Sequence, residues 1–524
     1  MIAQSGFEEC GADVDLAAAR PSLRRNVAAC VAISLFAVLY QTRWGTIPDT
    51  SWLITVCERI LDGERLYVEI YETNPPFTIW LYLPPVALAR LLDVAPETLV
   101  HAWTYLAAMV GFGFACVVVR RAAFPENTAL FAMAPAFYAL LVVFPGIAFT
   151  EREHIGMALF LPLLALLAWR AKPDGAAPGV GLAMLAGTSG SVLLLVKPYY
   201  ALMVLLPAIF IAWRRRSLQP ILAIEMWVIG FICTAYLVAV TLLYPEFISD
   251  VLPVLTDTYQ KIRGYWGVIL QFCVPWSFLM FLAWRLWPLG RVPELASVAA
   301  LASIAGMFPL IFQAKGWAYH AYPAILCAIL ALLCLIALPP SARRATQWQG
   351  AMPRFMRPGL AMVLTGLLVA YAPFVVSQKP SAGLINTVRG ATVNPTVAQI
   401  GSDLAVGHPL TRMVGGRWVE THVSDWLGTS ALYLFLSARL DGDVEEADRY
   451  KAMVERYATK KREEFESARP DVIAYQTNEK SWATLLENRF GFDQIMLNYH
   501  PIAEVDDVRI YLRNDYSPPA SRAD

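Results

Sequence analysis

The sequence predicts a mainly α-helical protein: a polytopic bundle of about eleven membrane-crossing helices, followed by a small C-terminal α/β domain. Two observations support this fold class. Hydrophobic residues make up 57% of the 524 residues and charged residues only 16%, whereas soluble domains carry roughly 25% charged residues. The apolar residues are also gathered into about a dozen long runs, roughly the length that spans a bilayer, and these runs stop abruptly near residue 376.

The runs approach the roughly 20 apolar residues that cross a bilayer as a helix. Examples are residues 27–40, 99–119, 129–144, 226–243 and 321–338. The first twenty residues are polar, without the basic start and the small-residue cleavage site of a removable signal peptide. We therefore expect residues 1–23 to form a cytoplasmic tail and the first apolar helix to stay in the membrane as an anchor.

The overall charge balance excludes one class of partner. The chain has 42 basic and 42 acidic residues, so there is no global electrostatic case for binding nucleic acid. The sequence contains no Asn-x-Ser/Thr glycosylation acceptor with a permitted middle residue, which favours a bacterial inner membrane. Membrane lipid is the expected surrounding partner.

Basic residues cluster between the apolar runs, and positively charged connections are typically cytoplasmic. The clusters are Arg24 and Arg25, Arg120 and Arg121, Arg170 and Lys172, Arg214 to Arg216, Arg285 and Arg291, and Arg343, Arg344, Arg354 and Arg357. All of them can be cytoplasmic only if two crossings separate each cluster from the next. This condition holds if residues 75–92, which four prolines interrupt, lie along the outer surface as in-plane helix rather than crossing. The membrane domain, residues 24–376, then has about eleven crossings.

The connections opposite the basic clusters should face outward. They are residues 43–100, 149–154, 197–200, 245–266 and 313–320. Residues 377–524 should face outward too, as a soluble periplasmic domain. In that domain, residues 444–465 are typical of a helix, and residues 472–475, 494–497 and 508–512 of short strands.

The first outward loop is acidic and aromatic. Asp49 follows the first apolar run directly and precedes Ser51 and an amphipathic helix, so its carboxylate could face a cavity at the membrane surface. The alternative is a helix N-cap, because Asp beside Thr and Ser before a helix is a common start signal.

A second outward connection, residues 150–154, places five polar residues directly before an apolar run. Ionisable residues at a membrane boundary are costly unless they pair or serve a site. Carboxylate and imidazole groups ligate divalent cations, and the candidate metal ligands are Glu72, Glu151, Glu153 and His154. The alternative is that Arg152 pairs with Glu151 or Glu153, at a helix N-terminus that favours acidic residues.

Isolated cations occur in the remaining outward connections. Lys197 lies between apolar runs, and Lys315 and His320 precede another, so these residues could hold a buried phosphate. Alternatively, Lys197 extends to the interface and His320 caps a helix. Tyr259 and Arg263 belong either to an interfacial aromatic belt or to a surface that contacts sugar and phosphate.

The order of these features resembles the polytopic glycosyltransferases of the GT-C superfamily, especially the protein-mannosyltransferase and aminoarabinose-transferase type (family 39-like). The residues that carry the resemblance are Asp49, Asp62-Gly63-Glu64-Arg65-Leu66-Tyr67, Asn74-Pro75-Pro76-Phe77 and Glu151-Arg152-Glu153-His154. In that family the first outward loop holds in-plane helices and the catalytic carboxylate, which corresponds to Asp49. Two positions depart from the family pattern. Thr50 replaces an acidic neighbour, which bears on metal dependence, and Asn74 replaces a lysine, which bears on the choice of donor.

The resemblance implies transfer of a sugar from a polyprenyl-phosphate donor to a hydroxyl of a glycan, lipid or protein acceptor on the outer face of the membrane. Asp49 would act as general base, and opposite-face attack would invert the anomeric carbon. A divalent metal ion is a possible cofactor. The candidates for binding donor phosphate or sugar are Lys197, Arg152, Arg263, Lys315, His320 and Tyr259.

Two other functions compete with this interpretation. A secondary transporter would also place ionisable residues in the membrane, but transporters commonly have repeated halves and sites near the midplane. The sequence shows no internal repeat, and its unusual charges fall at one surface. The second alternative is a non-catalytic receptor or envelope-assembly protein whose outer domain binds a partner.

Overall fold

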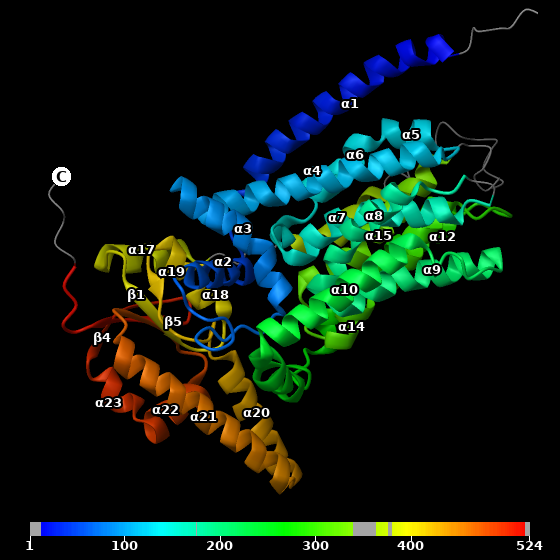
Figure 1. The fold of residues 1–524 in the computed structure, drawn as a ribbon. Coiled ribbons are helices and arrows are strands. Elements are labelled where there is room, and N and C mark those ends of the chain that lie inside the picture. The colour runs from blue at the N-terminus through cyan, green and yellow to red at the C-terminus, as the bar shows by residue number, and fades with distance from the viewer. Residues whose placement is uncertain (1–11, 44, 174–175, 339–362, 376–379, 519–524) are drawn as a thin grey trace, which may run out of the picture.

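The computed structural model describes residues 12–43, 45–173, 176–338, 363–375 and 380–518. A helical bundle is followed by a mixed α/β domain that covers one end of it (Figure 1). The bundle elements are α1 (Ala12–Gln41), α2 (Pro48–Leu61), α3 (Pro76–Leu92), α4 (Pro96–Ala122), α5 (Asn127–Ala132), α6 (Ala134–Val142), η1 (Gly146–Ala148), α7 (Arg152–Ala171), α8 (Val180–Val196), η2 (Pro198–Ala201), α9 (Leu202–Arg215), α10 (Ile224–Leu243), η3 (Phe247–Val251), α11 (Leu252–Val254), η4 (Leu255–Tyr259), α12 (Trp266–Leu286), α13 (Glu294–Gly306), α14 (Phe308–Gln313), α15 (Ala318–Ala337) and η6 (Ala372–Phe374).

Within the described residues, seven helices are long and apolar enough to cross a membrane. They are Leu23–Gln41, Pro96–Ala122, Arg152–Ala171, Ile224–Leu243, Trp266–Leu286, Glu294–Gln313 and Ala318–Ala337. Three shorter apolar helices, Pro76–Leu92, Val180–Val196 and Val363–Phe374, accompany them. The fold is therefore mainly helical and of membrane type, but the count of about eleven crossings is not confirmed.

Fewer long apolar helices are present than the expected crossings because some of the apolar runs are short or broken. The run at 129–144 divides at Met133 into α5 and α6, with Pro135 in the first turn of the second helix. Helices α8 and α9 have 17 and 14 residues, fewer than the roughly 20 that span a bilayer. The expected last crossing, 359–376, and the basic residues between 343 and 357 lie wholly or partly outside the described residues.

Helices α7 and α15 form the centre of the bundle, with 89% of each helix's most apolar 18-residue window buried inside the protein. The packing around α7 is close. A methyl group at Gly111 of α4 would lie 1.9 Å from the Ala158 carbonyl oxygen of α7. One at Gly190 of α8 would lie 2.3 Å from the Leu163 side chain. Small residues at such crossings let membrane helices approach each other. In contrast, only 11% of the corresponding window of α10 is buried.

Helix α3 runs crosswise to the long helices, at the end of the bundle near the C-terminal domain (Figure 1). Its N-terminal turns are tied to α10, because the Phe77 amide donates to Tyr236 Oη at 3.2 Å and Trp80 Nε1 donates to Tyr244 Oη at 3.1 Å. Tyr82 Oη donates to the Thr150 carbonyl oxygen at 2.6 Å, which joins α3 to the connection before α7.

The opposite end of the bundle carries a cluster of basic side chains. Arg170 of α7 forms a two-point ion pair with Glu225 of α10, with both N–O distances at 2.9 Å. Lys172 Nζ donates to the Ala123 carbonyl oxygen at 3.0 Å, and Arg215 donates to the Lys172 carbonyl oxygen. Figure 1 shows the end of α9 and the start of α1 on this side, away from the C-terminal domain.

The C-terminal domain contains a five-stranded sheet in the order β2-β1-β3-β5-β4. Strand β1 is parallel to β2 and β3, whereas β5 is antiparallel to β3 and β4. The domain elements are α17 (Ala382–Ala391), β1 (Thr396–Ile400), α18 (Leu404–Gly407), α19 (Leu410–Met413), β2 (Arg417–Trp418), α20 (Trp426–Asp441), α21 (Val444–Ala468), β3 (Val472–Gln476), α22 (Lys480–Phe490), α23 (Phe492–Met496), β4 (Tyr499–Val505) and β5 (Val508–Arg513).

Three of the four expected elements of this domain are confirmed as α21, β3 and β5, but the strand expected at 494–497 is wrong. Residues 492–496 form helix α23, and the strand begins later, at Tyr499. Gly491, with φ of +74°, ends α22 and immediately precedes α23. Helix α23 buries only one of its faces, through Phe492 and Ile495. A short strand with one buried face has a similar pattern of apolar residues.

The C-terminal domain docks on residues 43–100, which connect α1 to α4, through ionic and backbone contacts. Arg412 Nε lies 2.6 Å from Glu97 Oε1 of α4, and the same guanidinium pairs with Glu58 of α2. The Tyr71 amide donates to the Thr421 carbonyl oxygen at 2.9 Å. The domain is thus fixed to the loop that contains Asp49.

Replacing Arg412 with methionine should loosen this docking by about 1–3 kcal/mol, because two partly buried carboxylates lose their charged donor. Hydrogen exchange of the α2 and α19 amides would measure the effect and should become faster. The matched control is Arg417→Met, which removes an exposed arginine of the same domain. Equal exchange in both variants would contradict this account of the docking.

Candidate functional site

A cavity of about 1400 Å³ lies between the bundle and the C-terminal domain. It is lined by side chains from the first outward loop, from the connections before α7, after α8 and before α15, and from the C-terminal domain. Of the residues singled out in the sequence, Asp49, Glu72, Arg152, Lys197, Tyr259 and Lys315 line it. One cavity therefore unites segments that are up to several hundred residues apart.

Asp49 lies in the first turn of α2, and its side chain is 25% exposed. The N-cap position of this helix is occupied by Ile47, so the alternative interpretation of Asp49 as an N-cap is wrong. Instead, Asp49 Oδ2 lies 3.7 Å from Arg152 Nη2. Its carboxylate therefore remains accessible to a molecule in the cavity.

A chain of buried charges lies next to Asp49. Arg152 Nη1 is 3.2 Å from Glu151 Oε2, and Arg152 Nε is 3.7 Å from Glu153 Oε2. Lys197 Nζ is 2.6 Å from Glu153 Oε1 and 3.0 Å from His320 Nε2. Buried ions need partners of this kind. The pairing of Arg152 with its two acidic neighbours, one of the alternatives considered from the sequence, is present.

The charged residues of this buried group differ in their access to the cavity. Arg152 and Lys197 line it, with side chains 3% and 11% exposed. Glu151, Glu153 and His320 are fully buried and outside the described lining. The two cations thus present positive charge to the cavity, and the carboxylates behind them hold the cations in place.

Lys315 lines the cavity, whereas Arg263 does not reach its described lining. Lys315 Nζ donates to the Tyr259 and Ile262 carbonyl oxygens and lies 4.0 Å from the centre of the Tyr259 ring. Burial, and next the neighbouring Arg263, lower the pKa of Lys315 to about 8. Arg263 itself is exposed and is not among the described residues that line the cavity. Lys315 therefore fixes the loop around Tyr259, in addition to facing the cavity.

The four candidate metal ligands do not converge. Glu72 accepts hydrogen bonds from Trp52 Nε1 and from the Asn74 amide, the latter at 2.6 Å, and burial raises its pKa. His154 Nε2 instead donates to the Leu141 carbonyl oxygen at 2.6 Å. Among the described residues there is no group of three or more His, Cys, Asp or Glu side chains placed to hold a metal ion. As placed, Glu72, Glu151, Glu153 and His154 do not together form a divalent metal site.

Several lining residues could not be found from the sequence. Tyr319 packs against both buried cations, with its ring centre 5.3 Å from Arg152 Cζ and 5.1 Å from Lys197 Nζ. Ser402, Asp403, Trp426 and Ser430 reach the cavity from the C-terminal domain. The segments that contain these four residues of the C-terminal domain carry no unusual charge or motif. Only the folded protein brings them to the site.

The side of the cavity next to α8 and α10 is apolar. Leu194 and Leu195 of α8 and Cys233, Leu237 and Val240 of α10 contribute to it. A molecule in this cavity would therefore meet a carboxylate, two paired cations and a hydrocarbon surface together. That combination suits an amphipathic anion.

The chain matches no model of a known protein family, and a comparison with curated proteins finds no match either.

Proposed function

We propose that this chain is a membrane glycosyltransferase, which moves a sugar from a polyprenyl-phosphate donor to an acceptor hydroxyl on the outer face of the membrane, with inversion. The observation that carries the proposal is the arrangement of Asp49, Arg152 and Lys197 around one cavity that also has an apolar wall. A lipid phosphate is an amphipathic anion of the kind this cavity suits. The resemblance to GT-C enzymes supports the same reaction.

In the proposed reaction the acceptor oxygen attacks the anomeric carbon from the face opposite the phosphate. The bond between that carbon and the phosphate oxygen breaks, and the acceptor proton moves to Asp49. Arg152 and Lys197 stabilise the negative charge that develops on the departing lipid phosphate. The apolar side chains of α8 and α10 hold the first isoprenoid units of the lipid.

The proposed topology places the cavity and the C-terminal domain outside the inner membrane. Two features support it. The basic side chains gather at the opposite end of the bundle, as expected of a cytoplasmic face. Helix α3 runs crosswise to the long helices, as expected of a surface helix. We retain about eleven crossings as part of this proposal, with the shorter helices α8 and α9 among them.

The proposal is tested with the full-length protein in liposomes and a set of radiolabelled undecaprenyl-phosphate sugars, with envelope extract as the source of acceptor. One of the donors should give a labelled product, and Lys197→Met should lower the rate by at least tenfold. The control variant is Arg65→Gln, which removes an exposed cation of the first outward loop. If no donor is consumed, the enzyme proposal is wrong, and a transporter or an assembly role becomes the better explanation.

A further inference from the structure

The cavity has one wall to which the proposed reaction assigns no role. This wall, here called the domain wall, consists of Ser402, Asp403, Trp426 and Ser430 of the C-terminal domain. It begins at the carboxyl end of strand β1 and at the start of helix α20. It stands beside the loop of Tyr259, because the Trp426 and Tyr259 ring centres are 6.0 Å apart in an edge-to-face arrangement.

The domain wall combines an aromatic face with hydroxyl-binding groups. Trp426 is partly exposed and lines the cavity, and the Tyr259 ring that contacts it also lies 6.0 Å from Trp317. Asp403 Oδ1 accepts the Ala405 amide at 2.9 Å, and a carboxylate has further acceptor positions beyond that bond. Asp403 is the one charged residue among the four that define the domain wall.

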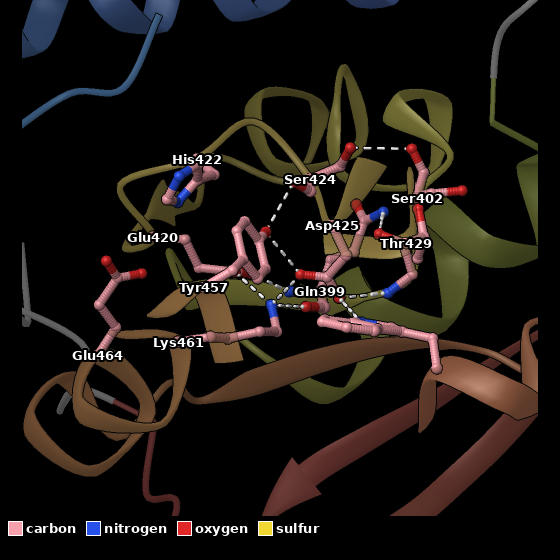
Figure 2. A network of polar contacts seen from close by, with 12 residues as sticks. Gln399, Ser402, Glu420, His422, Ser424, Asp425, Thr429, Tyr457, Lys461 and Glu464 are labelled. Atoms are coloured by element: carbon pink, nitrogen blue, oxygen red, sulfur yellow. Dashed lines mark hydrogen bonds and ion pairs between the residues drawn. The ribbon is translucent and has the colours of Figure 1, made fainter. Parts of the chain in front are cut away.

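The segment that carries Trp426 is held by buried charges. Lys461 Nζ lies 2.5 Å from Glu420 Oε2 and 2.8 Å from Asp425 Oδ1, and it donates to the Gln399 carbonyl oxygen at 2.7 Å. Tyr457 Oη donates to the same Asp425 oxygen at 2.9 Å. Figure 2 shows Lys461 and Tyr457 together at Asp425, the residue that precedes Trp426. Burial raises the pKa of Glu420, and the Lys461 charge opposes that rise.

The loop that carries Ser402 and Asp403 is held in a similar way. The Gly401 amide donates to Asp425 Oδ2, and the Ser402 amide to Glu479 Oε2, both at 2.9 Å. The Asp403 amide donates to Gln476 Oε1 at 2.9 Å. These backbone donors are therefore occupied, and a ligand meets side chains rather than an anion-binding loop. A wall fixed by both networks binds with little loss of conformational entropy.

The domain wall is close to the proposed base. Trp52, on the same helix as Asp49, contacts His408 of the C-terminal domain with 5.2 Å between ring centres and an interplanar angle of 57°. Burial, and next the charge of Asp49, raise the pKa of Tyr259, which contacts Trp426. A molecule on the domain wall therefore occupies the same cavity as Asp49.

We propose that the domain wall binds the acceptor, and that the acceptor is a neutral glycan. The C–H face of a sugar ring packs on the electron-rich face of Trp426, while neighbouring hydroxyls donate to Asp403 and Ser430. A single carboxylate suits neutral hydroxyl donors and disfavours an acidic acceptor. This inference rests on the proposed glycosyltransferase function, because it assigns the second substrate of the same cavity.

The test is a binding measurement that needs no donor. The full-length protein, in lipid nanodiscs free of sugar detergents, is titrated with cellobiose, maltose, mannobiose and chitobiose and followed by saturation-transfer NMR. At least one disaccharide should bind, and Trp426→Ala should weaken its binding at least tenfold. Trp426→Phe, which keeps an aromatic face, should retain most of the affinity. Asp403→Asn, which keeps the N-cap, should weaken binding severalfold.

Tyr433→Ala is the matched control, because Tyr433 is an exposed aromatic residue of the same helix. Failure of all four disaccharides to bind, or equal binding by Trp426→Ala and Tyr433→Ala, overturns the proposal. Trp426-dependent binding of a Ser/Thr-rich peptide in place of the sugars also overturns it, in favour of a protein acceptor. Glycan binding without sugar transfer would instead support the glycan-binding site and contradict the proposed glycosyltransferase function.

Discussion

Asparagine in place of Asp49 is expected to slow sugar transfer by about 10² to 10⁴-fold, the usual contribution of a positioned general base. The amide has nearly the same shape as the carboxylate but cannot accept the acceptor proton. The fold should be retained, because the side chain is partly exposed and its ion pair with Arg152 is long, at 3.7 Å. Single-turnover transfer by purified protein measures the chemical step separately from product release.

The matched control is Asp93→Asn. Asp93 is exposed at the end of α3, in a left-handed conformation that asparagine tolerates well. Transfer by this variant should equal that of the unchanged protein. An Asp49→Asn variant that transfers sugar at the normal rate would show that another group takes the proton.

Methionine in place of Lys461 is expected to destabilise the C-terminal domain by about 3–5 kcal/mol. The Lys461 side chain is 2% exposed, and its ammonium group neutralises two buried carboxylates, Glu420 and Asp425. Without it, these groups remain in the domain interior without their cation. Thermal unfolding, together with the rate of hydrogen exchange at the amides of β1 and α21, would measure the loss of stability.

Two further variants separate this charge effect from simple loss of packing. Lys451→Met removes an exposed lysine of the same helix and should change stability by less than about 0.5 kcal/mol. The triple variant Lys461→Met with Glu420→Gln and Asp425→Asn removes the whole charge cluster and should regain a large part of the lost stability. If the triple variant is no more stable than Lys461→Met alone, unpaired charge is not the cause.

Sequence reasoning succeeded where a single physical rule acts over the whole chain. The alternation of basic clusters predicted that Asp49, Glu151 and Lys197 lie on one face. Asp49, Lys197 and the neighbour of Glu151, Arg152, line one cavity, whereas Glu151 is buried behind it. Buried pairing of Arg152 with Glu151 and Glu153 was also among the alternatives, since charges at that depth require partners. The roles proposed for these residues remain predictions.

Sequence reasoning failed where local pattern and tertiary context differ. Span counting treated 129–144 as one helix, although the chain breaks into α5 and α6. The strand expected at 494–497 falls largely within helix α23, because a pattern of only four residues fits either state. The contact between Trp426 and Tyr259 joins positions 167 residues apart. Neither segment contains a motif that would predict this contact.

The bundle is packed unequally on the two sides of the cavity. On one side, the glycine contacts of Gly111 and Gly190 leave no free space between α7 and its neighbours. On the other side, α10 contributes Leu237 and Val240 to the cavity while most of its surface faces outward. If the cavity receives a lipid donor as proposed, the loosely packed side at α10 is the side on which its hydrocarbon tail would meet the surrounding membrane.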